Sequence, residues 1–159
     1  MNLILRNSKY VDYYTYLRVV LNKVSEFRNI KWVISGNELN SYLPGYENEP
    51  DYIEIGGAKL AHILNGMEHE PQFIWAVLSG YNITTKIRSA AYPTADGNER
   101  YWVRSPAPES ENAICEIVCL DSSCTLYIGI NSSISEKIKK IFPDIKDLDV
   151  ENTNRLTSR

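Results

Sequence analysis

The clearest pattern of hydrophobic and polar positions lies between residues 114 and 130, where two largely apolar runs are separated by a short polar turn. Residues 114–120 and 126–130 are rich in β-branched side chains and show the period of two that is typical of β-strands. The intervening residues, Asp121, Ser122 and Ser123, favour turns. The pattern therefore predicts a β-hairpin that is buried on at least one side.

A helix is predicted after this hairpin, over residues 133–142. Its apolar positions, at helical spacing, are Ile134, Ile138 and Ile141. Ser133 and Glu136 have the spacing of a capping box, in which each side chain accepts a hydrogen bond from a backbone N–H at the helix start. Pro143 prevents continuation of the helix. We expect the isoleucine face to pack on the hairpin.

Similar patterns predict the remaining elements. A stripe of apolar residues three and four positions apart predicts a helix over residues 9–25; the stripe consists of Val11, Tyr14, Leu17, Leu21 and Val24. Short apolar runs predict strands over residues 2–6, 30–34, 52–55, 73–78 and 101–103. The second of these strands is expected to end at Ser35-Gly36, and a helix is expected after Gly56-Gly57. Residues 83–88 fit either a strand or a short helix.

These elements predict an α+β fold with a central antiparallel or mixed sheet and helices packed on one face. A chain of 159 residues is long enough for one ordinary domain with its own core. We assign residues 1–150 to this domain. We expect residues 151–159 to form a frayed C-terminal tail, because few apolar residues remain there to anchor it.

Composition narrows the class of protein. The chain is 43% hydrophobic and 23% charged, with a net charge of −3, so it has no general attraction for nucleic acid or an anionic membrane. The apolar run Leu3–Leu5 is too short for a signal peptide, and no later run approaches the length of a transmembrane helix. We therefore expect a cytoplasmic protein with neither nucleic acid nor a membrane as its partner.

Candidate chemical groups are few. The three cysteines are Cys115, Cys119 and Cys124. An odd number of cysteines on predicted strands favours core thiols over disulfides or a metal site. His62 and His69 lie outside any HExxH motif, and Gly56-Gly57 lacks the spacing of a phosphate-binding loop. We therefore expect no catalytic residue, no cofactor and no bound metal.

An exposed loop is predicted over residues 37–51, which are rich in Asn, Pro, Gly, Glu and Tyr. Acidic residues alternate with aromatic rings in this loop, a composition that suits a surface for a basic protein partner. The residues that we assign to a partner-binding surface are Tyr46, Glu47, Glu49, Asp51 and Tyr52. The alternative is a solvated acidic loop without a partner.

Four motifs carry a resemblance to known proteins. They are FIWAVLSGYN, YPTADG with Trp102, EIVCLDSSCTLYI and FPDIKDLD, and the resemblance covers about residues 73–148. This combination resembles small uncharacterised bacterial cytoplasmic proteins that are themselves similar to immunity proteins of polymorphic toxin systems. Because the shared motifs are strands and turns, the resemblance implies a fold more strongly than a function. It transfers no active-site residue.

Three classes of function are compatible with the sequence. The leading hypothesis is a protein-binding module, specifically an immunity protein that neutralises a toxin by direct binding and is not an enzyme. A second is an enzyme on a small molecule that uses His62, His69 or a thiol together with a carboxylate, because catalytic groups need to meet only in space. A third is a structural or regulatory subunit that forms oligomers through an edge strand. A co-purifying partner discriminates between these classes.

Overall fold

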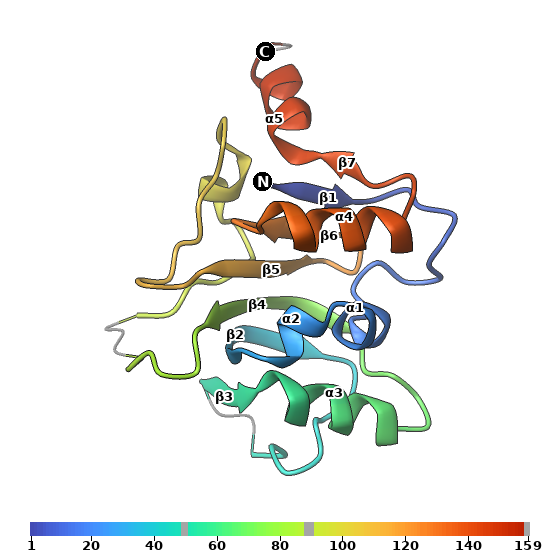
Figure 1. The fold of residues 1–159 in the computed structure, drawn as a ribbon, viewed down its shortest axis with the longest axis vertical. Helices are drawn as coiled ribbons and strands as arrows, with labels where there is room; N and C mark the ends of the chain where they lie inside the picture. Colours follow the sequence, from blue (N-terminus) through green and yellow to red (C-terminus); the bar gives the residue numbers. More distant parts are fainter. Residues whose placement is uncertain (49–50, 88–90, 158–159) are drawn as a thin grey trace.

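A single antiparallel β-sheet forms the centre of the molecule (Figure 1). The computed structural model describes residues 1–48, 51–87 and 91–157. Within these residues, seven strands pair in the order β3-β2-β4-β5-β6-β1-β7, and each pair of neighbours is antiparallel. The strands are β1 (Leu3–Leu5), β2 (Lys31–Leu39), β3 (Tyr52–Gly56), β4 (Phe73–Tyr81), β5 (Cys115–Leu120), β6 (Cys124–Ile128) and β7 (Lys146–Asp147). The predicted α+β fold is confirmed.

The predicted hairpin is formed by β5 and β6. Glu116 pairs with Ile128 at one end of the hairpin, and Leu120 pairs with Cys124 at the other. Asp121 and Ser122 both have positive φ angles, of 46° and 53°, which suit the right-handed twist of a tight hairpin. Every residue of both strands is buried, so the hairpin is covered on both of its faces.

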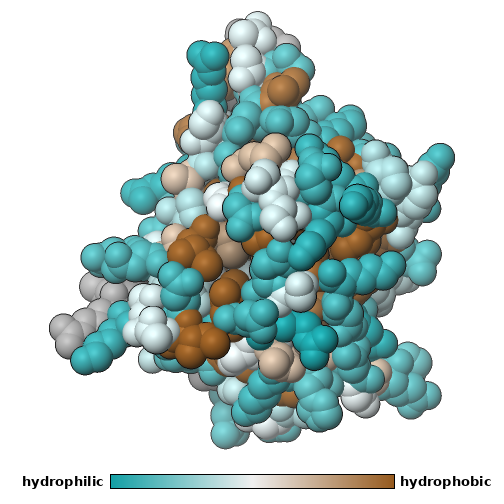
Figure 2. All heavy atoms as spheres, in the orientation of Figure 1, coloured by the Kyte–Doolittle hydropathy of each residue, from teal (hydrophilic) through white to brown (hydrophobic). Residues whose placement is uncertain are grey.

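Four helices cover one face of the sheet, as predicted. They are α1 (Arg18–Lys23), α2 (Ser25–Arg28), α3 (Gly57–Gly66) and α4 (Ser132–Ile141). Leu21, Phe27, Leu64 and Ile138 from these helices join one hydrophobic cluster with sheet residues such as Ile117. In Figure 1 the helices lie over the strands, and Figure 2 shows that their outer surface is largely hydrophilic. Amphipathic packing therefore builds this layer.

The helix predicted over residues 9–25 is wrong in its first half, because helical structure begins only at Arg18. The carbonyl oxygen of Tyr14 accepts a hydrogen bond from Thr125 Oγ1 on β6, and that of Thr15 accepts one from Phe73 N on β4. Ser8 Oγ also donates to Asp144 Oδ1 at 2.8 Å. The bonds to Tyr14 and Thr15 use backbone carbonyl groups that a helix would need for its own ladder.

The helix predicted over residues 133–142 is present as α4, but its predicted capping box is wrong. The cap is Asn131, whose Oδ1 accepts a hydrogen bond from Ile134 N at 2.9 Å. Ser133 Oγ instead donates to Glu26 Oε1 on α2 at 3.1 Å. Glu136 pairs with Lys139 on the helix surface. The helix cap is therefore Asn131, two residues before the predicted Ser133.

The second face of the sheet is covered by an irregular segment that includes residues 91–114. The short 3-10 helix η1 (Glu99–Trp102) lies in this segment, where the sequence pattern predicted a strand over residues 101–103. Its buried side chains join a second hydrophobic cluster with the sheet. This cluster includes Ile4, Val77, Ala95, Tyr101, Val118, Leu126 and Ile128. The sheet is therefore covered by helices on one side and largely by irregular chain on the other.

A buried carboxylate holds this irregular segment on the sheet. Glu116 on β5 has no exposed surface, and its oxygens accept four hydrogen bonds. Two come from the backbone N–H groups of Glu109 and Ser110, at 3.1 and 2.9 Å. Two come from the hydroxyls of Ser79 and Tyr101, at 3.0 and 3.1 Å. Burial raises the pKa of Glu116, although the four donors oppose this shift.

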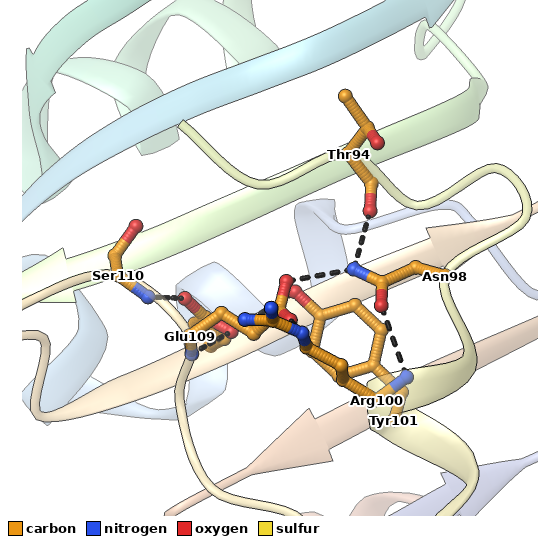
Figure 3. A network of polar contacts seen from close by, with 7 residues as sticks. Thr94, Asn98, Arg100, Tyr101, Glu109 and Ser110 are labelled. Atoms are coloured by element: carbon orange, nitrogen blue, oxygen red, sulfur yellow. Dashed lines mark hydrogen bonds and ion pairs between the residues drawn. The ribbon is translucent and has the colours of Figure 1, made fainter. Parts of the chain in front are cut away.

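A second set of polar contacts surrounds Asn98, as Figure 3 shows. Asn98 Nδ2 donates to the carbonyl oxygen of Thr94 at 2.9 Å and to Glu109 Oε2 at 2.7 Å. Asn98 Oδ1 accepts a hydrogen bond from Arg100 N at 3.0 Å, and this contact caps η1. The Arg100 guanidinium lies 3.3 Å from Glu109 Oε1. Side chains thus replace the backbone ladder that this segment lacks.

Residues 151–157 belong to a helix, where the sequence predicts a frayed tail over 151–159; residues 158 and 159 lie outside the described residues. Helix α5 (Leu148–Thr157) begins directly after β7, and Leu148 is fully buried. Asn152, which is 1% exposed, donates hydrogen bonds to the carbonyl oxygens of Tyr101 and Val103 at 3.0 and 2.7 Å. A buried amide therefore anchors a segment that has few apolar residues.

Candidate partner-binding pocket

A pocket of about 390 Å³ lies at the end of β2, beside the start of β3 and the loop that joins them. We call it the β2–β3 pocket. Its lining residues are Gly36, Asn37, Glu38, Leu39, Ser41, Tyr42, Leu43, Tyr46, Asp51 and Ile53. The pocket thus lies within the loop region that the sequence marked as a partner-binding surface.

A bulge in β2 shapes this pocket. The register between β2 and β4 shifts between Ser35 and Glu38, and Gly36 has a φ of 53°. A side chain at position 36 would be strained at this angle, and its Cβ would lie 3.1 Å from Thr94. Pairing then resumes with Glu38 opposite Trp75. The predicted end of this strand at Ser35-Gly36 is therefore wrong, because the strand continues past the bulge to Leu39.

The loop is fixed to the core by two apolar contacts. Leu43 is 2% exposed and belongs to the hydrophobic cluster on the helix side of the sheet. Tyr46 is partly buried against that cluster, and its N–H donates to the carbonyl oxygen of Leu43 at 2.9 Å. The Lys59 ammonium lies 5.4 Å from the centre of the Tyr46 ring. Tyr42, in contrast, is 58% exposed at the pocket.

Two carboxylates line the pocket without a partner of their own. Glu38 and Asp51 are both exposed residues. Neither side chain makes a hydrogen bond or an ion pair with any residue that the structure describes. The pocket therefore offers two free negative charges beside two tyrosine rings, which is an arrangement suited to a cation.

The structure brings Tyr46 and Asp51 of the five predicted partner-binding residues to this pocket. Glu47 is exposed and accepts a hydrogen bond from Gly45 N at 2.7 Å, and this bond lowers the pKa of Glu47. Tyr52 does not line the pocket, because its ring packs on Tyr92 with 4.5 Å between ring centres. Glu49 lies outside the described residues.

Sequence reasoning missed Glu38 as a lining residue. Ser35-Gly36 is typical of the end of a strand, so the sequence predicts a loop after it and does not predict where the Glu38 side chain points. The available signal was Leu39, an apolar residue that follows Glu38 and is partly buried against the core. A strand continuing through a glycine bulge would have placed Glu38 beside the loop.

The groups considered for catalysis lie elsewhere in the structure. Cys115, Cys119 and Cys124 are free and buried, as predicted for core thiols. Burial raises the pKa of the Cys115 thiol to about 12 and that of Cys124 to about 11, so both are protonated at neutral pH. His62 and His69 are exposed, the former on α3.

Two kinds of feature are absent from the described residues. No group of three or more His, Cys, Asp and Glu side chains within them is placed to hold a metal ion. None of the described helices is both long enough and apolar enough to cross a membrane.

Comparisons with known proteins add no relative. No protein-family model matches this chain, and no match was found among curated proteins or among solved structures.

Proposed function

We propose that the protein binds another protein, and that the β2–β3 pocket takes a lysine or arginine side chain of that partner. The observation that carries this proposal is that Glu38 and Asp51, which pair with no described residue, lie in one pocket with Tyr42 and Tyr46. A guanidinium or ammonium group that enters the pocket gains charge-assisted hydrogen bonds and contact with an aromatic ring.

The size and surroundings of the pocket support this assignment. Its volume of about 390 Å³ lies at the lower end of the range for ligand sites, which suits one long side chain better than a large cofactor. Glu47 lies beside the pocket and adds to the negative charge of the loop. Exposed acids of this kind raise the association rate of a basic partner.

The finer proposal is that the partner is a toxin and that the protein acts as its immunity protein in the cytoplasm. It is supported by the motifs of residues 73–148, which resemble proteins similar to immunity proteins. The β2–β3 pocket is lined by residues 36–53 and lies outside all of these motifs. The identity of the partner therefore depends on the resemblance, and the binding of a basic side chain depends on the pocket.

The first experiment uses N-acetylarginine amide and N-acetyllysine amide as probes. We expect either probe to shift the amide resonances of residues 36–46 in a nuclear magnetic resonance titration, with a millimolar Kd. Glu38→Gln combined with Asp51→Asn should weaken binding about thirtyfold, because each of the two lost charge-assisted bonds contributes roughly 1 kcal/mol. Glu68→Gln, at an exposed acid that does not line the pocket, is the matched control. Equal binding by the double variant and the control would refute the pocket.

The second experiment measures binding kinetics against a co-purified partner. Glu38→Lys combined with Asp51→Lys should slow association and weaken its dependence on salt, because these acids attract the basic surface. Tyr46→Ala should mainly accelerate dissociation, because a partly buried ring forms short-range contacts. Wild-type rates in both variants would place the interface elsewhere.

A further inference from the structure

Strand β3 forms one edge of the sheet, at the bottom in Figure 1. It pairs with β2 on one side, and within the described residues no strand pairs with its other side. Gly57 N donates to the carbonyl oxygen of Ile30 at 2.8 Å, and this bond continues the β2–β3 register by one step. The backbone N–H and C=O groups of successive residues in an antiparallel strand point alternately to one side and the other. Gly57 bonds to the β2 side, so Ile55 and Ile53, two and four residues earlier, also bond to β2.

It follows that the N–H and C=O groups of Tyr52 and Glu54 point away from the sheet. No hydrogen bond outside the sheet joins these four groups to any described residue. Both residues are exposed: Tyr52 has 44% of its surface accessible and the Glu54 side chain has 48%. An accessible row of unpaired backbone groups is a template for one more strand.

The opposite edge of the sheet differs. Strand β7 has only two residues, Lys146 and Asp147, and the chain enters α5 directly after them. The Asp147 side chain caps the start of that helix by accepting a hydrogen bond from Val150 N at 3.0 Å. The β7 edge therefore offers a much shorter template than β3.

We propose that an extended segment of the partner, rich in lysine or arginine, adds to the sheet as a further strand beside β3. The inference rests on the proposed function, because the same segment would place one basic side chain in the β2–β3 pocket. Asp51 and Ile53 both line that pocket. Ile53 belongs to β3, and Asp51 is the residue directly before the strand. The edge and the pocket are thus continuous.

Charge at this edge favours a basic partner over a second copy of the chain. Two β3 strands paired with each other would bring Asp51 and Glu54 of both copies into one short segment, and like charges on paired strands repel. Lys31 already pairs with Glu54, at 3.2 Å, but it leaves Asp51 without a cation. A lysine-bearing strand supplies the missing positive charge.

The test uses a synthetic peptide that alternates lysine and valine, together with the same peptide methylated on every second backbone nitrogen in each of the two possible phases. The unmethylated peptide should bind, and it should slow hydrogen exchange at the Tyr52 and Glu54 amides. At least one methylated peptide should bind about tenfold more weakly, since it keeps all charges and side chains but cannot complete the strand ladder.

Two variants of the protein at one position form the matched comparison. Glu54→Pro removes the outward N–H but none of the bonds to β2, because proline is tolerated on the outer side of an edge strand. Glu54→Gln removes the same charge and keeps the N–H. We expect Glu54→Pro to weaken peptide binding about tenfold and Glu54→Gln to weaken it about threefold.

Several outcomes would overturn the proposal: no binding of the lysine-valine peptide, equal binding of all three peptides, or equal effects of Glu54→Pro and Glu54→Gln. Concentration-dependent dimers that Glu54→Pro abolishes would instead identify a second copy as the occupant. If Glu54→Pro fails to fold, the methylated peptides decide the question with the wild-type protein. Binding of N-acetylarginine amide in the pocket without peptide binding at the edge would leave the proposed function in place and reject the added strand.

Discussion

Tyr101 and Glu116, which are 15 positions apart, meet in the interior, where the tyrosine hydroxyl donates to Glu116 Oε2 at 3.1 Å. Both residues are fully buried, one in the irregular cover and the other in the middle of the sheet. Four neutral donors surround the carboxylate, and no described cation pairs with it. The cover is therefore held by a buried acid whose hydrogen-bond donors are all neutral.

Glu116→Gln tests this arrangement through pH. Burial raises the pKa of Glu116 above 4.5 in the folded protein. Between pH 4.5 and this raised pKa, the folded protein therefore keeps a proton on Glu116 that the unfolded chain has lost. The corresponding stability is complete below pH 4.5 and is lost as pH rises through the folded pKa. Glu116→Gln should lower the free energy of unfolding by about 1–3 kcal/mol at about pH 5, because its amide N–H groups face donors. The deficit should shrink by about pH 8.

Urea unfolding at the two pH values measures this deficit. Glu111→Gln, at an exposed acid of the same segment, provides the control and should show no such trend. A deficit for Glu116→Gln that stays constant with pH would contradict the raised pKa.

Asn152→Ala should loosen α5 from the rest of the protein. The substitution leaves the carbonyl oxygens of Tyr101 and Val103 without their donor, which costs about 1–3 kcal/mol for buried groups. Hydrogen exchange should accelerate throughout α5. Leu156→Ala removes a side chain that is 51% exposed on the same helix, and it should change stability by about 0.5 kcal/mol or less. Similar effects of both substitutions would show that Asn152 is not the anchor.

The ion pair between α2 and α4 should be visible in acid unfolding. Lys137 Nζ donates to both oxygens of Glu26, at 2.6 and 2.7 Å, and these bonds lower the pKa of Glu26 to about 2. The stability from Glu26 is present above pH 4.5 and is lost as pH falls through about 2. Lys137→Met should lower stability by about 0.5–1 kcal/mol at neutral pH and flatten the acid transition.

Lys140→Met serves as its control, because Lys140 is exposed on the same helix and makes no ion pair with a described residue. Equal losses from the two substitutions would indicate a general effect of lost charge instead of a specific pair.

Gly57→Ala should be strongly destabilising. A Cβ at this position would lie 2.0 Å from the carbonyl oxygen of Phe27, where α3 passes closest to the end of α2. The chain must shift to admit it, at a cost of about 3 kcal/mol. Gly66→Ala, in the same helix, meets nothing within 4 Å and should leave the melting temperature unchanged or raise it. A stable Gly57→Ala variant would show that these two helices can move apart.

Local patterns predicted the elements whose hydrogen bonds are local. The hairpin of β5 and β6 and the helix α4 follow from alternation and from helical spacing in adjacent residues. The helix over residues 9–25 was over-predicted because Tyr14 and Thr15 give their carbonyl groups to strands distant in sequence. Sequence periodicity carries no information about such partners.

The candidate site was predicted only in part for the same reason. Composition identified the loop, and Tyr46 and Asp51 do line the β2–β3 pocket. It could not reveal that Glu47 closes a local turn, or that Tyr52 packs on Tyr92. Glu116 likewise looked like one polar position in an alternating strand, and only the fold shows that a distant segment supplies its donors.

The order of the strands in the sheet also limits when each strand can pair while the chain is being synthesised. Strands β2, β3 and β4 all lie within residues 31–81, so they can pair soon after they are made. Strand β1 precedes every other strand, yet its neighbours are β6 and β7, and Leu3 pairs with Tyr127 and Asp147. Closing so long a loop makes its docking a late, slow event. The first strand of this sheet to be synthesised is therefore among the last to pair, and its apolar segment stays exposed until β6 has been made.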